Sequence, residues 1–432
     1  MSRNIDINVK HVTRIEGHGS IVVKAQDGTI RQVEWQVPEA PRFFEAMMRG
    51  LSWQDIQAVV SRVCGICSIS HSLAAIKGIE SAMDIQVSGQ TEKLRLLAHF
   101  SEYLQSHVLH VGYLVAPDLL GVKSVVPLVE THFDVVKTVI KLHRLANNWS
   151  DLLAGRTTHP VTFKPGGFSK LPAESELREL RATLQSIVPD LKTLAGVVLS
   201  LAGKIPAFER ETEYIALVHP NTYTFYHGQI GSTDTPETVP VEEFESVVNE
   251  YVSPQSTAKW TRWHRDAYAV GALARFNLNS DYLMPLAAGA AKSFGLKSKC
   301  FNPYMNSIAQ LVEAVHIVES SLQLIDELLT AGLKQEVPQV KPKAGIGAGC
   351  VEAPRGILFH RYAFDDQGLC TAANICIPTN QNHANIQKDF EALVPKIIDR
   401  SQNEIRLALE MLVRAYDPCV SCSTHYLDVK FV

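Results

Sequence analysis

The sequence contains no run of about 18 apolar residues free of charge, which is the length that a membrane-spanning helix requires. We therefore expect no transmembrane segment. Residues 1–8 also lack the apolar centre of a signal peptide, so we expect no cleaved export signal. The net charge of only −4 gives no indication of nucleic acid as a partner, because nucleic-acid binding needs a basic surface.

Cysteine is also scarce, with eight residues in 432, which excludes a disulfide-stapled scaffold. Half of the cysteines are scattered, and we interpret them as buried free thiols rather than ligands of an iron–sulfur cluster. They are Cys300, Cys350, Cys370 and Cys376. The chain has no glycine-rich dinucleotide fingerprint and no internal repeat, so no electron carrier is evident within it.

Hydrophobic periodicity predicts a mainly helical α+β protein, with a central bundle of long helices flanked by small sheets. Region 1–40 is expected to be β structure, with a two-residue hairpin at Asp27-Gly28. Region 41–340 holds the bundle, and region 341–432 holds a β segment, a last helix and a metal-ligand tail, all within one integrated subunit. Helices are predicted over 91–115, 127–153, 172–203, 258–275, 303–333 and 383–415, a Pro/Gly-rich connector over 334–349, and β structure over 350–380.

Two Cys-x-x-Cys pairs stand at opposite ends of the chain, each followed closely by a histidine. Such pairs can supply four thiolates to one metal site and so draw the two ends together. A structural zinc site is one interpretation, although small zinc modules space their pairs by about 15–20 residues and need no charged groups nearby. Affinity for thiolate does not separate zinc from nickel. The residues are Cys64, Cys67 and His71, and Cys419, Cys422 and His425.

The residues around these pairs resemble motifs of the large subunits of nickel–iron hydrogenases. The stretch from Arg62 through Cys64-Gly65-Ile66-Cys67 to His71 is similar to the family's first cysteine motif, and Asp417-Pro418-Cys419 to His425 is similar to its last. Three further stretches follow the family's pattern in the expected order, so the resemblance runs from about residue 8 to residue 425. They are Arg14-Ile15-Glu16-Gly17-His18, Glu352-Ala353-Pro354-Arg355-Gly356 and Pro378-Thr379.

This resemblance implies a catalytic large subunit, with the hydrogenase large-subunit fold, that interconverts H2 with protons and electrons. It implies that all four cysteines bind nickel, and that Cys67 and Cys422 also bridge to an iron carrying one carbon monoxide and two cyanide ligands. Cys64 and Cys419 would be terminal nickel ligands. Cys419 is expected to accept the proton from H2, and Glu16 matches the carboxylate that passes this proton outward.

Other polar residues match family positions around the metals. Arg355 and Thr379 match the donors of hydrogen bonds to cyanide, and Pro378 belongs to the same cofactor-binding stretch. Asp417 is expected to pair with Arg355. Judged without the resemblance, Arg355 would be read as part of a surface ion pair, Asp417 as a turn residue and Glu16 as an exposed loop carboxylate.

A second cation site is also implied. Glu45 and His425 match ligands of a magnesium or iron ion, and a backbone carbonyl near Cys376 or Ile377 would complete the site. His71 is expected to support the four-cysteine site without binding the metal, because four thiolates already surround it.

The sequence departs from the family pattern in two places. Ser106 stands where many members have aspartate, a feature of the soluble, cofactor-coupled (group 3-like) branches. Family members are made as precursors that an endopeptidase cuts just after the last histidine, whereas residues 426–432 remain here. We expect the mature chain to end at His425.

Electrons from H2 must leave a chain that has no electron carrier, so the resemblance implies a small subunit with iron–sulfur clusters as partner. Further electron-transfer subunits, metal-insertion proteins and a cytoplasmic location are also expected. Two alternatives stay open. The quinone-side subunit of respiratory complex I shares the fold but lacks the four cysteines, and a zinc-stapled scaffold without catalysis would hold zinc alone.

Overall fold

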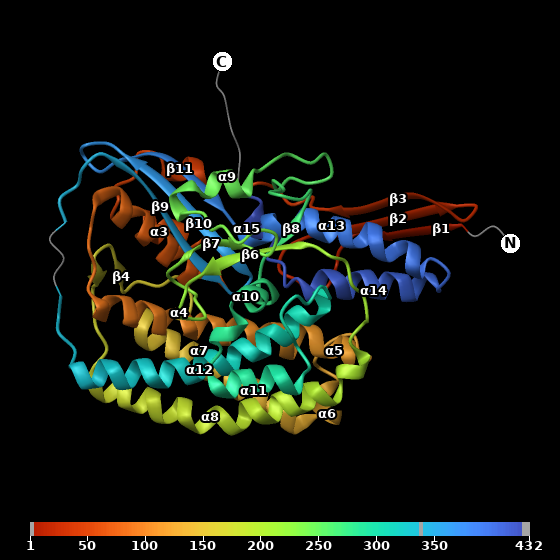
Figure 1. Cartoon of the computed structure of the whole chain (residues 1–432), viewed down its shortest axis with the longest axis horizontal. Helices are drawn as coiled ribbons and strands as arrows, with labels where there is room; N and C mark the ends of the chain where they lie inside the picture. The colour runs from red at the N-terminus through yellow and green to blue at the C-terminus, as the bar shows by residue number, and fades with distance from the viewer. Residues whose placement is uncertain (1–3, 337–339, 426–432) are drawn as a thin grey trace, which may run out of the picture.

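The computed structural model describes residues 4–336 and 340–425. Long helices packed side by side form one level of the molecule, and small sheets with their covering helices form the other (Figure 1). One apolar core runs through both levels, from Ile5 in the first strand to Cys422 near the C-terminal end. The predicted mainly helical α+β architecture is confirmed.

Four long helices form the bundle. In α8 the buried residues recur every three or four positions from Leu177 to Val198, so one face packs in the core while the other is charged. The segment Pro303–Ala331 is the one helical stretch of the described residues long and apolar enough to cross a membrane, and 67% of its most apolar window is buried. The four are α4 (Gly89–Leu109), α7 (Phe133–Ala154), α8 (Glu174–Ser200) and α12 (Asn306–Ala331).

Helix α4 does not stop at Leu109 but continues into a π-helical turn, η1 (His110–Val115), and then into the short helix α5 (Ala116–Leu119). π-helical turns are rare and occur frequently at functional sites. This turn packs against α12 and α14 and so lies close to the C-terminal segment that carries the second cysteine pair.

The N-terminal segment forms an antiparallel sheet of β1 (Ile5–Val9), β2 (Ser20–Gln26) and β3 (Thr29–Gln36). The predicted hairpin is confirmed, because Asp27 and Gly28 both have positive φ (+52° and +77°), as a type I′ turn requires. The connection from β1 to β2 is irregular and includes Glu16.

A second antiparallel sheet has the order β11 (Cys370–Cys376), β10 (Gly356–Phe364), β9 (Gly345–Ala353). Helix α3 (Ser68–Met83), which begins directly after Cys67, packs on β9 and β10. Arg355 lies in the tight turn between β9 and β10. This sheet therefore positions parts of both the first cysteine pair and the arginine motif.

The predicted connector over 334–349 is wrong for its last residues, because Gly345, Gly347 and Gly349 belong to β9. Side chains alternate along a strand, so these glycines face α3 together. A Cβ atom at Gly349 would lie 2.1 Å from the carbonyl oxygen of Ala74, and one at Gly347 would lie 2.2 Å from the nitrogen of Ala82. The glycines are needed for close contact between the helix and the strand, not for a flexible connection.

The predicted last helix over 383–415 is in fact two helices, α13 (Pro378–Ile397) and α14 (Gln402–Ala415). Ser401 Oγ accepts the N–H of Glu404, and the Glu404 carboxylate accepts the N–H of Ser401 (2.9 Å), which is a capping box. The Ser-x-x-Glu spacing of residues 401–404 already indicated the start of a new helix in the sequence.

The predicted helix over 258–275 is wrong before Ala272. Trp260 instead pairs with Tyr251 through two backbone hydrogen bonds of 2.8 Å. The strand β8 (Tyr268–Ala269) then pairs with β6 (Glu213–Val218), and α10 (Ala272–Asn279) begins only after it. Pairing with distant segments overrides the local preference here.

The remaining elements are short. They are α1 (Phe44–Met48), α2 (Ile56–Val60), α6 (Leu128–Thr131), β4 (Phe163–Lys164), β5 (Gly167–Phe168), β7 (Gln229–Ser232), α9 (Phe244–Val248), α11 (Pro285–Ser293), α15 (Val420–Ser423), and the 3₁₀ turns Ala202–Lys204, Val241–Glu243, Ser280–Tyr282 and Pro303–Met305.

Candidate metal centre

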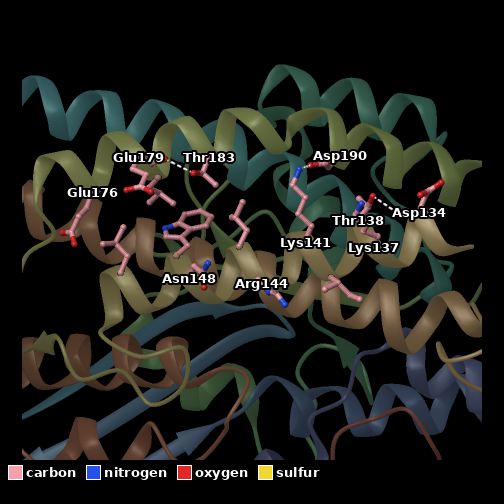
Figure 2. Close-up of a pocket in the computed structure, with 15 residues that line it drawn as sticks. Asp134, Lys137, Thr138, Lys141, Arg144, Asn148, Glu176, Glu179, Thr183 and Asp190 are labelled. Carbon is pink, nitrogen blue, oxygen red and sulfur yellow. Dashed lines mark hydrogen bonds and ion pairs between the residues drawn. The ribbon is translucent and has the colours of Figure 1, made fainter. Parts of the chain in front are cut away.

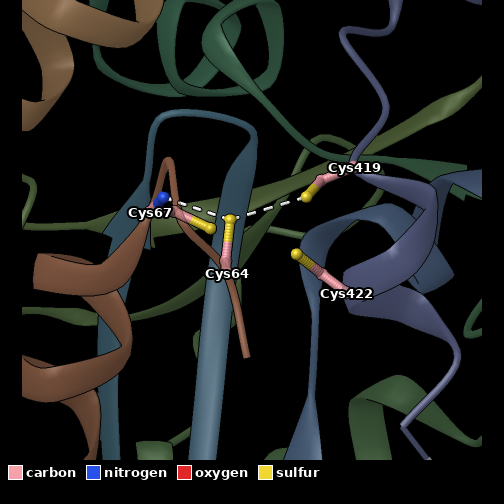
Figure 3. Close-up of side chains that lie close together, drawn as sticks. All are labelled: Cys64, Cys67, Cys419 and Cys422. Carbon is pink, nitrogen blue, oxygen red and sulfur yellow. Dashed lines mark hydrogen bonds between the residues drawn. The ribbon is translucent and has the colours of Figure 1, made fainter. Parts of the chain in front are cut away.

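The two Cys-x-x-Cys pairs meet in the core of the molecule, as the sequence predicts (Figure 3). The Sγ atoms of Cys64, Cys67, Cys419 and Cys422 all lie within 4.8 Å of one another, and none of these residues is more than 6% exposed. Cys67 is the residue directly before α3, and Cys422 lies in α15. Four buried sulfur atoms at this separation can share one or two metal ions.

Backbone N–H groups and Arg355 favour a negative charge on Cys64. The N–H groups of Ile66 and Cys67 donate to Cys64 Sγ at 3.3 and 3.1 Å, and Cys419 Sγ lies 3.6 Å away. Burial raises the pKa of Cys64, but hydrogen bonds from the neighbouring thiols and the charge of Arg355 hold this pKa well below its ordinary value.

The pKa values of the other three thiols are shifted in the opposite direction. Hydrogen bonding to Cys419 raises the pKa of Cys67 well above its usual range, hydrogen bonding to Cys422 does the same for Cys419, and burial does so for Cys422. Like charges repel at this distance, so the four thiols do not readily ionise together without a cation between them. A bound metal cation removes this obstacle, so the donor set fits a metal that all four bind as thiolates.

Arg355 lies beside the thiols and pairs with Asp417, as predicted. Its Nε donates to the backbone oxygen of Asp417 (2.7 Å), and its Nη2 donates to the Asp417 carboxylate (3.0 Å). The charges of Asp417, Cys419 and Cys67 raise the pKa of Arg355 against the effect of burial. Arg355 Nη1 is buried and has no hydrogen-bond partner among the described residues. A buried donor left unpaired is costly, so this atom fits an acceptor on a bound group.

Gln310 holds Asp417 directly and His110 holds Gln310, and neither residue was predicted from the sequence. Gln310, in α12, donates to Asp417 Oδ2 (3.0 Å), and its amide oxygen lies 2.5 Å from His110 Nδ1. His110 Nε2 in turn contacts the carbonyl oxygen of Arg414 (2.6 Å). Gln310 is fully buried, and its neighbours in the sequence do not indicate which distant residues it contacts.

Glu16 reaches the second cysteine pair from the irregular β1–β2 connection. Its Oε2 lies 3.1 Å from Cys419 Sγ and accepts the N–H of Ser421 at 3.1 Å. The backbone oxygen of Glu16 accepts the N–H of Val420 at 3.0 Å. The half-buried carboxylate is therefore within direct proton-transfer distance of the Cys419 sulfur.

Thr379 and Pro378 form the start of α13 beside Cys419. Pro378 takes the first helical position, where its missing N–H is not needed. Thr379 Oγ1 accepts the N–H of Cys419 at 2.9 Å. The hydroxyl hydrogen of Thr379 remains available to donate to another group.

Glu45 and His425 meet at the edge of the second sheet. His425 Nε2 lies 2.6 Å from the carbonyl oxygen of Ile375 and 3.4 Å from Glu45 Oε1. Burial raises the pKa of Glu45, but the hydrogen bond and charge of His425 bring this pKa below its usual value. The carbonyl oxygen beside His425 is that of Ile375, just before the residues Cys376 and Ile377 named from the sequence.

Arg42, which is not among the residues predicted from the sequence, joins the two cysteine loops. Its Nη2 donates to the carbonyl oxygens of Val63 (2.9 Å) and Ser421, and its backbone N–H donates to Thr424 (2.6 Å). One side chain thus holds together the segments that carry the two cysteine pairs.

His71 and Ser106 are both fully buried in the core. His71 Nδ1 lies 3.0 Å from His360 Nε2, and His71 is not one of the four residues that could share a metal. His71 Nε2 and Ser106 Oγ are buried without a hydrogen-bond partner in the described part of the chain. The predicted cleavage after His425 concerns residues 426–432, which lie outside the described residues.

A cleft with a volume of about 870 Å³ lies elsewhere, between α7 and α8 (Figure 2). Lys141 on α7 forms an ion pair with Asp190 on α8 across it. None of the predicted site residues lines this cleft. The four predicted cysteine ligands lie together in the interior instead.

Comparisons with known proteins agree with this geometry. A family model described as nickel-dependent hydrogenase matches residues 42–157 and 218–425, and a model described as HoxL-like matches residues 6–40. Sulfhydrogenase 1 subunit alpha of Pyrococcus furiosus is 30% identical over 425 residues, which cover 98% of both chains. NAD-reducing hydrogenase HoxS subunit beta of Cupriavidus necator is 27% identical over 482 residues, covering 99% of this chain and 96% of that one.

Two solved structures are also similar. An NAD⁺-reducing [NiFe]-hydrogenase in the H2-reduced state matches 98% of this chain and 100% of its own, with a TM-score of 0.89 and 25% identity. A [NiFeSe] hydrogenase from Desulfovibrio vulgaris Hildenborough has a TM-score of 0.81 with 21% identity over the same shares, which shows a common fold.

Proposed function

The chain belongs to the nickel-dependent hydrogenase family as a large subunit, an oxidoreductase acting on H2, and we propose that its four buried cysteines hold a nickel–iron centre. The observation that carries this proposal is the compact group of four sulfur atoms with Arg355 beside it. Cys64 and Cys419 would bind nickel alone, and Cys67 and Cys422 would bridge nickel and iron. When bound, the centre supplies the reversible heterolytic splitting of H2, which yields two protons and two electrons.

The iron is proposed to carry carbon monoxide and cyanide ligands. Arg355 Nη1 and the Thr379 hydroxyl would donate hydrogen bonds to cyanide, and Pro378 would pack against the same ligands. Support comes from the unpaired Nη1 donor and from the hydroxyl hydrogen that Thr379 has free. Asp417 holds the Arg355 guanidinium in place through its carboxylate and its backbone oxygen.

The proton from H2 is proposed to leave through Cys419 and Glu16. The separation of 3.1 Å between Cys419 Sγ and Glu16 Oε2 supports this route, since proton transfer needs hydrogen-bond distance. The N–H of Ser421 holds the Glu16 carboxylate at this position. Glu16→Gln should therefore slow isotope exchange between D2 and water without loss of metal.

A magnesium or iron ion is proposed at Glu45 and His425. The Glu45 carboxylate, the Ile375 carbonyl oxygen and His425 Nε2 are close enough to share one cation. Metal analysis of Glu45→Gln, compared with the parent protein, tests this site. A cation content that does not change would contradict it.

We further propose that the chain works in a cytoplasmic complex with a small subunit that carries iron–sulfur clusters and with further electron-transfer subunits. Its relatives include subunits of sulfhydrogenase and of NAD-reducing hydrogenase, which supports a complex of this kind. Regions 1–40, 41–340 and 341–432 would act as one catalytic unit, because Glu16 and the two cysteine pairs come from all three. Identifying the proteins that copurify with the native chain tests the proposed partners.

Assembly is proposed to need metal-insertion proteins and an endopeptidase that cuts after His425. His425 is buried and bonded through both ring nitrogens, which fits a residue at the end of a closed site. Intact-mass measurement of active protein decides whether residues 426–432 are removed.

Metal analysis of the purified complex, combined with infrared spectroscopy, tests the main proposal. We expect nickel together with an excess of iron, because the iron–sulfur clusters of the small subunit add iron, and infrared bands from carbon monoxide and cyanide. A zinc-stapled scaffold would give zinc alone and no such bands, which would overturn the assignment.

A further inference from the structure

Asp118, in the short helix α5, is buried between two arginine side chains. Arg14 Nη2 lies 2.5 Å from Asp118 Oδ1, and Arg414 places Nε 2.7 Å from Oδ2 and Nη2 3.0 Å from Oδ1. The side chains of Asp118 and Arg414 are only 3% and 1% exposed. One carboxylate thus joins cations from the two ends of the chain, and charge-assisted contacts of this kind are strong and directional.

Arg14 holds the irregular segment that carries Glu16, two residues further along. Its backbone has φ of +61°, in the left-handed region that non-glycine residues rarely adopt. Arg14 Nη1 donates to the carbonyl oxygen of Leu114 (2.5 Å) in the π-helical turn. Arg414 Nη1 donates to the carbonyl oxygen of Thr13 (3.0 Å). Side-chain contacts to the helices therefore hold this part of the β1–β2 connection, which has no regular secondary structure.

Arg414 also holds the start of the second cysteine motif. It lies in the last turn of α14, and its carbonyl oxygen accepts the N–H of Asp417 (2.9 Å) and contacts His110 Nε2 (2.6 Å). The chain leaves the helix here and reaches Cys419 within a few residues. The position of Arg414 thus sets the position of the Cys419 backbone.

These two segments also touch at Glu16 and Cys419. The contacts between them are Glu16 Oε2 to Cys419 Sγ and to the Ser421 N–H, both 3.1 Å, and Glu16 O to the Val420 N–H at 3.0 Å. Both segments are attached to Asp118 a few residues earlier. We propose that Asp118 is a positioning residue, which holds Glu16 at proton-transfer distance from Cys419 by joining Arg14 to Arg414.

This inference rests on the proton role proposed above for Glu16, and the experiment separates the two. The main variant is Arg14→Asn, because asparagine removes the guanidinium but tolerates the left-handed backbone. Asp118→Asn is made in parallel, since it keeps the size of the side chain and removes its charge. The matched control is Arg181→Asn, which breaks an exposed two-bond pair between Arg181 and Asp326 on the bundle surface.

The first measurement needs no metal. Amide hydrogen exchange, followed by mass spectrometry on the metal-free protein, reports the N–H groups of Val420 and Ser421, which Glu16 accepts. We expect faster exchange at these two amides in Arg14→Asn and Asp118→Asn, and unchanged exchange in Arg181→Asn. If these two amides exchange at the parent rate in both Arg14→Asn and Asp118→Asn, the proposal is overturned.

The second measurement is isotope exchange between D2 and water in the complete complex, with metal content and infrared bands recorded in parallel. A displacement of about 1 Å can reduce a rate by about 100-fold, so we expect Arg14→Asn to slow exchange by roughly 10- to 100-fold with the metals retained. When combined with Glu16→Gln, Arg14→Asn should cause no further decrease, because it acts through Glu16.

The outcomes distinguish the two hypotheses. If Glu16→Gln exchanges at the parent rate, the proton role of Glu16 is wrong. If Glu16→Gln slows isotope exchange while Arg14→Asn and Asp118→Asn both exchange at the parent rate, Asp118 does not position Glu16. A double variant slowed by the product of the two separate factors also overturns the proposal, because it shows independent action. If Arg14→Asn does not fold, Asp118→Asn is judged by the same two measurements, and its parent-like behaviour is equally decisive.

Discussion

At the scale of single residues, the site depends on buried polar atoms that each have a defined partner. Arg355 is bonded to Asp417, Asp417 to Gln310, and Gln310 to His110, all within the core. A buried charge is tolerated only when it is paired, so loss of any one member leaves another unsatisfied. Among the described residues, Arg355 Nη1 is one of the buried atoms without a partner, and it is the atom that we assign to a bound ligand.

Cys422→Ser should abolish metal binding. Outside the thiol group, Cys422 Sγ contacts the carbonyl oxygen of Val63 at 3.7 Å, so its surroundings accept a hydroxyl of similar size. Oxygen is a poor ligand for soft metals, so we expect nickel to fall to background and H2 turnover to drop at least about 100-fold. Elemental analysis and H2 uptake check this. Cys300→Ser is the control, and normal metal content in Cys422→Ser would refute the ligand assignment.

At the scale of elements, the contact of α3 with β9 determines where the first cysteine pair lies. The helix begins directly after Cys67, and its axis is set by glycines at alternate strand positions. The backbone of Gly349 is so close to Ala74 and Gly78 that any side chain would displace the helix. The position of Cys67 is therefore coupled to residues nearly 300 positions away in the chain.

Gly349→Ala should destabilise the protein by about 3 kcal/mol, because its Cβ would lie 2.1 Å from Ala74 O and force backbone shifts. Metal retention should fall as well, since the start of α3 moves. Gly196→Ala in α8 is the matched control, because no atom lies within 4 Å of the added Cβ. The free energy of unfolding of this control should increase by about 0.5–1 kcal/mol. Urea unfolding of the three proteins measures both effects, and equal midpoints for Gly349→Ala and the parent would contradict the close contact.

At the scale of the whole molecule, neutral histidines are buried where layers meet. His383 accepts the Trp35 indole N–H (3.0 Å) on one nitrogen and contacts Ser423 Oγ (2.9 Å) with the other, which joins the N-terminal sheet, α13 and α15. His316 Nδ1 accepts the N–H of Met284 (3.1 Å). Burial lowers the pKa of His383 to about 3 and that of His316 to about 4.

This burial links stability to pH. In the unfolded chain these rings take up a proton near pH 6.5, whereas in the folded protein they stay neutral. Above pH 6.5 their burial therefore costs no stability. As pH falls from 6.5 toward 4, the free energy of unfolding decreases, by about 2 kcal/mol for each ring at pH 5. Two buried carboxyls change the stability in the opposite direction, so that it rises as pH falls. Burial raises the pKa of Glu102 to about 8 and that of Glu352 to about 7. A comparison of variants therefore isolates the histidines.

His316→Gln should weaken the loss of stability between pH 7 and pH 5, measured as the shift in urea midpoint of the metal-free protein. The exposed His18→Gln should leave that shift unchanged. If the two variants lose stability in parallel with the parent, His316 does not titrate as the structure implies.

The sequence by itself determined the features that depend on near neighbours. The Asp27-Gly28 hairpin and the long amphipathic helices were predicted correctly, because turn chemistry and periodicity are local properties. The ligand type and spacing of the cysteine pairs, with their flanking motifs, were enough to predict the family and the meeting of the two ends. The roles of Glu16, Arg355 and the second cation site stay predictions.

Only the tertiary structure decided what surrounds the four thiols. Gln310, His110 and Arg42 are spread over the chain, and nothing in their own surroundings in the sequence marks them as partners of the site. The glycines of β9 looked like a connector, because the helix that needs them comes from a distant part of the chain. Asp118 likewise acquires its place between two arginines only on folding. Contacts between distant residues depend on how the layers pack, and packing is a property of the whole molecule.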